Sequence, residues 1–214
     1  MTVLGICAIT ATLINLWYCY HERVENFFWN WPAYGLIAVG MFLNHAYANA
    51  AMQIVQAGVS TYGFFIWTRH RNHNLKQMLY SMVHDRHHRS YPSPVIATSR
   101  MHLNTHFYSL LAILVITAVL YSILRQVNDI APVIDAISFA FLLIASIQLN
   151  YKKIESWIYF IIADLLSLLL AYKAGNWYNM AAVSLLAVLN MVCFARWFKR
   201  MKDTRLYAKG DEQL

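Results

Sequence analysis

Long apolar stretches separated by short polar stretches run through most of this 214-residue chain. Seven of them approach the roughly 17 to 25 residues that a helix needs to cross a hydrocarbon core of about 30 Å. They are continuous and lack the alternation of half-buried strands, which favours helices. The expected helices cover residues 2–20, 27–44, 47–67, 106–124 and 133–150, followed by a helical hairpin within 151–200. The pattern predicts an all-α membrane protein with seven transmembrane helices.

One polar interval is much longer than the others. Residues 68–105 contain six Lys and Arg residues and several histidines, which makes them too charged to cross a bilayer. We expect a cytoplasmic loop that is partly helical at the membrane surface. It separates a first three-helix unit, 1–67, from a linker helix, 106–125, a second three-helix unit, 132–200, and a tail, 201–214. The first stretch lacks the basic leader and cleavage site of a signal peptide, so we expect it to be retained.

Composition and charge agree with a membrane location. The chain is 59% hydrophobic and 13% charged, which leaves little polar surface for a soluble domain. A net charge of +7 could suggest nucleic acid, but the basic residues lie at the ends of apolar stretches. Across seven spans, 15 Lys and Arg residues fall on one side and 2 on the other. The positive-inside rule then places the N-terminus outside and the C-terminus in the cytoplasm, as in an inner-membrane protein.

The chain also resembles itself at a constant offset of 130 residues. Residues 23–67 and 153–197 align without gaps, with helix boundaries at matching places. Identical pairs include Glu25 and Glu155, Ala33 and Ala163, Asn49 and Asn179, Ala57 and Ala187, Phe64 and Phe194, and Trp67 and Trp197. The helix at 106–124 would supply the odd crossing between two like-oriented units. We predict a parallel 3+1+3 repeat, which in transporters places the substrate near the midplane between the units.

A stripe of polar and small residues marks one face of the third predicted helix. It is formed at spacings of three and four by Asn49, Gln53, Gln56, Ser60 and Gly63. The corresponding stripe of the last helix is sparser and retains Asn190. Such amides can bond to neighbouring helices for about 0.6 kcal/mol each, or they can bind the hydroxyl groups of a substrate. Both interpretations stay open, and the length of the first stripe favours a substrate.

Trp157, Phe160 and Asp164 share one face of the sixth predicted helix, at i, i+3 and i+7. The aromatic pair can belong to the core or face lipid, or it can stack on a flat heterocycle, whose positive charge would gain about 0.5 to 2 kcal/mol. A carboxyl group inside a span should face protein or water, because placing it in lipid costs about 2.5 to 3.5 kcal/mol. Asp164 is therefore either a structural acid between helices or part of a substrate site.

The histidines support a rival hypothesis. His70 and His73, His84 with His87 and His88, and His102 with His106 resemble the boxes that hold iron in membrane-bound desaturases and hydroxylases. Those enzymes gather their boxes from separate regions, whereas these histidines lie in one basic tract, so we favour a solvated loop without metal. The three cysteines have no metal or redox spacing. A membrane scaffold without substrate is a third possibility, and no nucleotide-binding loop is visible.

The hairpin and the third helix carry motifs of a known family. KKIESWIYFIIADLLSLLLAYKAGNW, with its lysine, Glu155 and Trp157 entry, resembles the sixth helix of the PnuC vitamin transporters. YANAAMQIVQAGVSTYGFFIW is similar to their third-helix motif. The positions that match there are Tyr47, Ala48, Gln53, Tyr62, Gly63 and Trp67. Asp135 at the start of the fifth helix also fits, and the resemblance covers residues 23–67 and 106–200.

The resemblance implies a facilitator for nicotinamide riboside or a related vitamin, which a cytoplasmic kinase traps by phosphorylation. The family's binding aromatics correspond to Trp157 and Phe160, and its binding glutamine to Gln53. Phe160 and Phe64 each stand where the family has Trp, so thiamine, riboflavin or a deoxynucleoside are alternative substrates. Members often form trimers. The histidine-rich loop has no counterpart that we can match.

Together, the residues and the resemblance predict a uniporter that works by alternating access, without cofactor or metal. Trp157 and Phe160 would stack on the ring of the substrate. The polar groups of the substrate would be bound by Gln53, Asn49, Ser60, Asp164 and Asn190.

Overall fold

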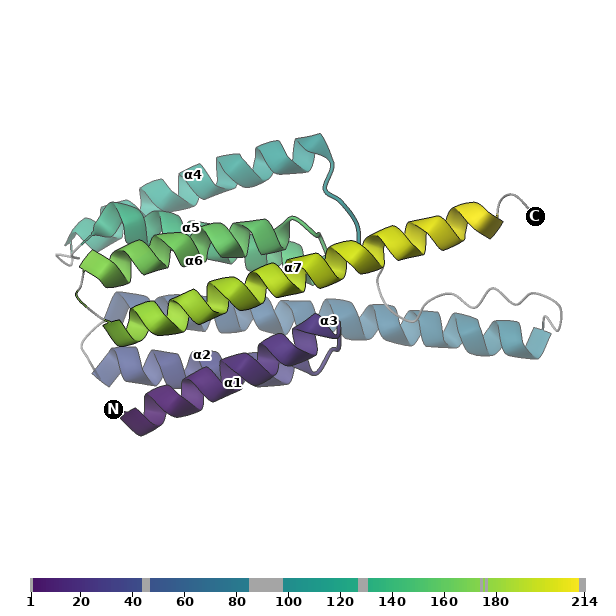
Figure 1. Ribbon diagram of the computed structural model, residues 1–214, viewed down its shortest axis with the longest axis horizontal. Coiled ribbons are helices and arrows are strands. Elements are labelled where there is room, and N and C mark those ends of the chain that lie inside the picture. Colours follow the sequence, from purple (N-terminus) through teal and green to yellow (C-terminus); the bar gives the residue numbers. More distant parts are fainter. Residues whose placement is uncertain are drawn as a thin grey trace.

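The computed structural model describes residues 2–43, 47–84, 98–126, 131–173, 175 and 177–211. Within these ranges the chain forms seven α-helices, which confirms the all-α prediction (Figure 1). They are α1 (Thr2–Tyr20), α2 (Asn26–Leu43), α3 (Tyr47–His84), α4 (Leu103–Gln126), α5 (Pro132–Asn150), α6 (Ser156–Lys173) and α7 (Trp177–Asp211). The first residue of each helix lies within three positions of its predicted start wherever a start was predicted.

α3 and α7 are much longer than a single span, at 38 and 35 residues. Both project beyond the other helices at the same end of the bundle (Figure 1). α3 continues past Trp67 to His84, so the first part of the segment expected to be a surface loop is a direct extension of a predicted span. Residues 68–84 contain neither Gly nor Pro, and good helix formers such as Lys76, Gln77 and Leu79 allow the helix to continue.

Five helices are long and apolar enough to cross a membrane in the part of the chain that the structure describes: α1, α4, α5, α6 and α7. α2 and α3 contain polar residues within the stretches expected to span, such as Asn30, Tyr34, Gln53 and Gln56. These polar residues line the internal cavity described below, so they do not face lipid.

The helices pack in two groups of three. α1 packs on α2 and α2 on α3, while α5 packs on α6 and α6 on α7. The groups meet where α3 packs on α5 and α1 on α7. α4 packs mainly on α5 and lies at one edge of the bundle (Figure 1).

The loops that follow α1 and α5 have the same backbone conformation at positions 130 apart. Glu22 and Lys152 have φ values of 55° and 50°, and no other non-glycine residue among those described has a positive φ. Glu22 N–H donates to Cys19 O at 2.9 Å, and Lys152 N–H donates to Leu149 O at 2.9 Å. The same holds at the start of the next helix, where Phe27 N–H donates to Val24 O and Trp157 N–H donates to Ile154 O. Each loop thus turns the chain from one helix into the next in the same way.

A buried aromatic cluster closes the bundle beside these two loops. Its fully buried members come from α1, α2, α3, α6 and α7 and from the second loop. They are Cys19, Phe27, Trp67, Ile154, Trp157, Cys193, Trp197 and Met201. Phe27 meets Trp67 edge to face with ring centroids 5.2 Å apart, and Trp157 meets Trp197 in the same way at 5.3 Å. The cluster joins the two groups of helices at this end.

Candidate functional site

A cavity of about 270 Å³ lies inside the bundle. Its described lining comes from six helices, α1, α2, α3, α5, α6 and α7, and includes no residue of α4. Most of the lining is apolar, with a limited number of amides, hydroxyls and one acid. A small, mostly apolar chamber with a few polar groups is typical of a site for a small organic molecule.

The aromatic pair of α6 forms one wall of the cavity. The ring centroids of Trp157 and Phe160 are 5.8 Å apart, and their planes make an angle of 48°. Trp157 is 1% exposed, and its Nε1–H has no hydrogen-bond partner among the described residues. Because the rings are tilted, they form a corner in which a flat ligand can stack on one ring and meet the edge of the other. The indole N–H is available to a ligand acceptor.

Asp164, one turn further along α6, is the single Asp, Glu, Lys or Arg residue in the described lining. Asn190 on α7 donates a hydrogen bond of 2.7 Å to its Oδ2 atom. The bond fixes the carboxylate between two helices through one of its two oxygens. The acid is therefore both a structural contact and a charged group at the cavity, so the two interpretations of the sequence are compatible.

The polar stripe of α3 faces the same cavity. Gln56 is 0% exposed, and neither atom of its side-chain amide has a hydrogen-bond partner among the described residues. The hydroxyl of Ser60, one turn later, is also buried without a described partner. Leaving such groups unpaired costs about 1 to 3 kcal/mol each, so a native chain usually retains them for a ligand or an ordered water. Gln53 is half-buried and lines the cavity as well.

Close packing between the two groups of helices sets the shape of this wall. Asn150, at the end of α5, donates from Nδ2 to Val59 O of α3 at 3.0 Å, and Trp67 Nε1–H donates to Asn150 O at 2.9 Å. Gly63 lies under this contact, where a Cβ atom would come within 2.6 Å of Asn150 Cγ and of Phe27 Cε1. Only glycine fits at this close approach.

The structure brings together almost all of the residues predicted for the site. The described cavity lining includes Trp157, Phe160, Asp164, Gln53, Ser60 and Asn190. The side chain of Asn49 lies outside the described part of the chain, so its predicted role stays a prediction.

Several lining residues were not in the predicted set. Among them are the polar side chains of Gln56, Asn15, Asn30 and Tyr34. Asn15 of α1 bonds through its side chain to Asn30 of α2. Gln56 belongs to the polar stripe of α3, so the sequence pattern already indicated that it shares a face with Gln53 and Ser60. Asn30 and Tyr34 lie 130 residues before Phe160 and Asp164, at the offset of the internal similarity. This correspondence could have indicated from the sequence that they line the cavity.

Both the sequence and the fold of this chain are similar to those of known proteins. The sequence profile of the family described as nicotinamide mononucleotide transporter matches residues 2–199. The chain belongs to this family. Its fold is also similar to the crystal structure of the vitamin B3 transporter PnuC, with a TM-score of 0.71 and 15% sequence identity, over 94% of this chain and 83% of the other. No curated protein matches the sequence significantly.

Membership of the nicotinamide mononucleotide transporter family decides between the classes considered from the sequence. The family and its structural neighbour are transporters and not enzymes, so the desaturase or hydroxylase hypothesis is set aside. Most of the histidines on which that hypothesis depended have side chains outside the described part of the chain. The cavity is accordingly a candidate site for a transported molecule.

Proposed function

We propose that the chain carries nicotinamide riboside, or a closely related vitamin or nucleoside, across the inner membrane by facilitated diffusion. The observation that carries this proposal is the cavity in which an aromatic pair, one carboxylate and unpaired amide and hydroxyl groups meet. In the substrate complex, the pyridinium ring stacks on Trp157 or Phe160 and its positive charge is balanced by Asp164. The ribose hydroxyls bond to Gln53, Gln56 and Ser60, and Asn49 and Asn190 complete the site.

The charge of the cavity favours a substrate without phosphate. A phosphate group is usually bound by Arg, Lys or a helix N-terminus, and the described lining contains no Arg or Lys. Asp164 would in addition repel a phosphate. The family description names a mononucleotide, but these residues support the corresponding cationic nucleoside.

The packing of the helices supports a mechanism of alternating access. In our proposal all seven helices span the membrane, and two like-oriented units of three, 1–67 and 132–200, rock about the central cavity with α4 as linker. The two groups of three helices and the matching loops at 22 and 152 support this arrangement. The basic ends of α3 and α7 face the cytoplasm, and the N-terminus lies outside. A cytoplasmic kinase then traps the product, and the protein acts as a uniporter in a trimer.

Uptake by proteoliposomes tests the proposal. Purified protein should carry labelled nicotinamide riboside down its gradient, and Trp157→Ala and Gln53→Ala should each lower the initial rate at least about tenfold. Trp17→Ala is the matched control for the first variant, because Trp17 is 64% exposed on α1 and does not line the cavity. Normal uptake by both cavity variants would refute the site. Competition by thiamine, riboflavin and deoxynucleosides ranks the alternative substrates.

A further inference from the structure

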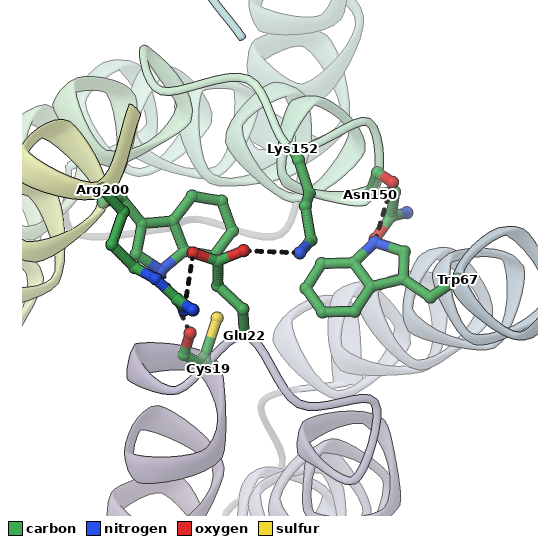
Figure 2. Close-up of polar contacts among 7 residues, drawn as sticks. Cys19, Glu22, Trp67, Asn150, Lys152 and Arg200 are labelled. Carbon is green, nitrogen blue, oxygen red and sulfur yellow. Dashed lines mark hydrogen bonds and ion pairs between the residues drawn. The ribbon is translucent and has the colours of Figure 1, made fainter. Parts of the chain in front are cut away.

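Two charged residues at equivalent positions of the matching loops bind each other. Lys152 Nζ lies 2.7 Å from Glu22 Oε2, and Arg200 Nη1 of α7 lies 3.0 Å from Glu22 Oε1 (Figure 2). The side chain of Lys152 is 0% exposed and that of Glu22 is 9% exposed. Residues related by the offset of 130 can touch only where the two halves of the bundle meet. The ion pair therefore lies where the two halves meet.

The two tryptophans around the ion pair make reciprocal contacts between the halves. Trp67 of α3 donates from Nε1–H to Asn150 O at the end of α5, at 2.9 Å. Trp197 of α7, 130 residues later, donates from Nε1–H to Cys19 O near the end of α1, at 3.1 Å. Lys152 Nζ lies 4.5 Å from the ring centroid of Trp67 and 5.7 Å from that of Trp197. In Figure 2 the ammonium group of Lys152 lies between the Glu22 carboxylate and the Trp67 ring.

These contacts lie next to the cavity, at the end of the bundle from which α3 and α7 extend. We call it the basic end because many Lys and Arg residues lie there. Cys19, Phe27 and Trp157 line the cavity and are packed in one aromatic cluster with Trp67 and Trp197. The loops that hold the ion pair also carry Arg23 and Lys153, and α3 and α7 extend past this end of the bundle (Figure 1). Any molecule leaving the cavity here must pass between the two halves that the ion pair and the tryptophans hold together.

We propose that Glu22 and Lys152, capped by Arg200 and flanked by Trp67 and Trp197, form a latch that closes the basic end of the cavity. Opening this end requires the two loops to separate, which breaks the Glu22–Lys152 contact and both tryptophan hydrogen bonds. The latch rests on the alternating access proposed above. Its test measures access to the cavity without any substrate, so it can fail or succeed independently of the transported molecule.

Cys19 is a native reporter for this test. It is 1% exposed and lies on the cavity side of the latch. The chain has two other cysteines, Cys7 and Cys193. In a Cys7→Ser/Cys193→Ala background, a membrane-impermeant maleimide applied to vesicles of either orientation reports access to Cys19 from each side. A protease-sensitive tag at the C-terminus defines which side is the basic end, because α7 ends there.

The informative variants are Lys152→Gln and the double variant Glu22→Gln/Lys152→Gln. The double variant leaves neither buried charge unpaired and retains an amide pair, so it keeps the loops folded. Both should be labelled about tenfold faster than the parent from the basic end only, as a shift of about 1.4 kcal/mol toward the open state produces. The matched controls Lys153→Gln and Glu25→Gln remove the same charges from the same loops without touching the ion pair, and they should keep the parental rate.

Unchanged labelling of the double variant, with a normal elution profile in gel filtration, would overturn the latch. So would faster labelling from the opposite side, which would place the opening elsewhere. Faster labelling of the two controls to the same degree would show that loop charge alone governs access, and this result also contradicts the proposal.

Discussion

Asp164 on α6 and Asn190 on α7 are joined by a hydrogen bond of 2.7 Å at the cavity wall. The amide donor holds one oxygen of the acid in place, so the carboxyl group is fixed at the cavity wall by two helices. In the proposed site, a carboxyl group fixed in this way would favour a cationic vitamin over a neutral one of similar shape.

Asp164→Asn should therefore separate cationic from neutral ligands. The new amide oxygen can still accept the bond from Asn190, so the fold is kept. The affinity for nicotinamide riboside should fall at least about tenfold, because a charge interaction in a partly desolvated site is lost. Binding of neutral riboflavin, if it occurs, should not weaken. Isothermal titration measures both, with Asp203→Asn on the exposed part of α7 as control. An unchanged affinity for the cation would remove Asp164 from the site.

Two buried glutamines should respond in opposite ways to replacement by methionine. Gln56 has no described partner and lines the cavity, so Gln56→Met should keep or raise the thermal stability, while weakening substrate binding about tenfold. Gln148 Nε2 donates to Ser109 Oγ at 3.0 Å and does not line the cavity. Gln148→Met should lower the free energy of unfolding by about 1 to 3 kcal/mol and leave binding unchanged. Equal effects of the two changes would contradict the role of Gln56.

Gly63→Ala should be destabilising, because the added methyl group would overlap Asn150 and Phe27. The expected loss is about 1 to 3 kcal/mol, the usual cost of overpacking a filled contact. A methyl group added at Gly58, also on α3, would meet no described atom within 4 Å. Gly58→Ala should therefore stabilise the protein by up to about 1 kcal/mol through helix propensity. Thermal unfolding in detergent compares the two, and a stable Gly63→Ala variant would show that the contact with α5 is loose.

Burial lowers the pKa of Lys152 below its ordinary value of 10.5, and the neighbouring Glu22 carboxylate offsets part of this shift. Between the lowered pKa and 10.5, the unfolded chain binds more protons at this residue than the folded chain does. Lys152 therefore makes the free energy of unfolding rise with pH in this interval. The difference in stability between the wild type and Lys152→Gln should shift in favour of the wild type as the pH approaches 10.5. Parallel melting curves across this range would contradict the assignment.

Much of the fold was predictable because the apolar stretches are continuous and close to one span in length. The ring pair and the α3 stripe were predictable for a related reason, since residues spaced by three, four and seven share a helical face. The direct extension of α3 to His84 was not predictable in this way, because the charge of residues 68–105 indicates a surface loop that is only partly helical. The absence of Gly and Pro after Trp67 was the better signal.

Other features depended on packing that no local pattern records. The sequence could not tell that Gln148 has a partner for its Nε2 atom while the amide of Gln56 has none among the described residues, because this depends on which side chains the neighbouring helices present. Nothing in the sequence pattern indicated a contact between Glu22 and Lys152. The internal similarity begins at Arg23, and Glu22 and Lys152 have opposite charges, so no identity joins them. Their contact depends on the packing of the two loops against each other.

The cavity walls contributed by α2 and α6 differ at corresponding positions. Phe27, Asn30 and Tyr34 stand where Trp157, Phe160 and Asp164 stand 130 residues later, and all six line the cavity. One wall thus offers two rings and an acid, and the other offers a phenyl ring, an amide and a phenol. A ligand with a charged ring at one end and a sugar at the other has a single favourable orientation between them. It should cross the bilayer without turning over, presenting the same end to α6 throughout its passage.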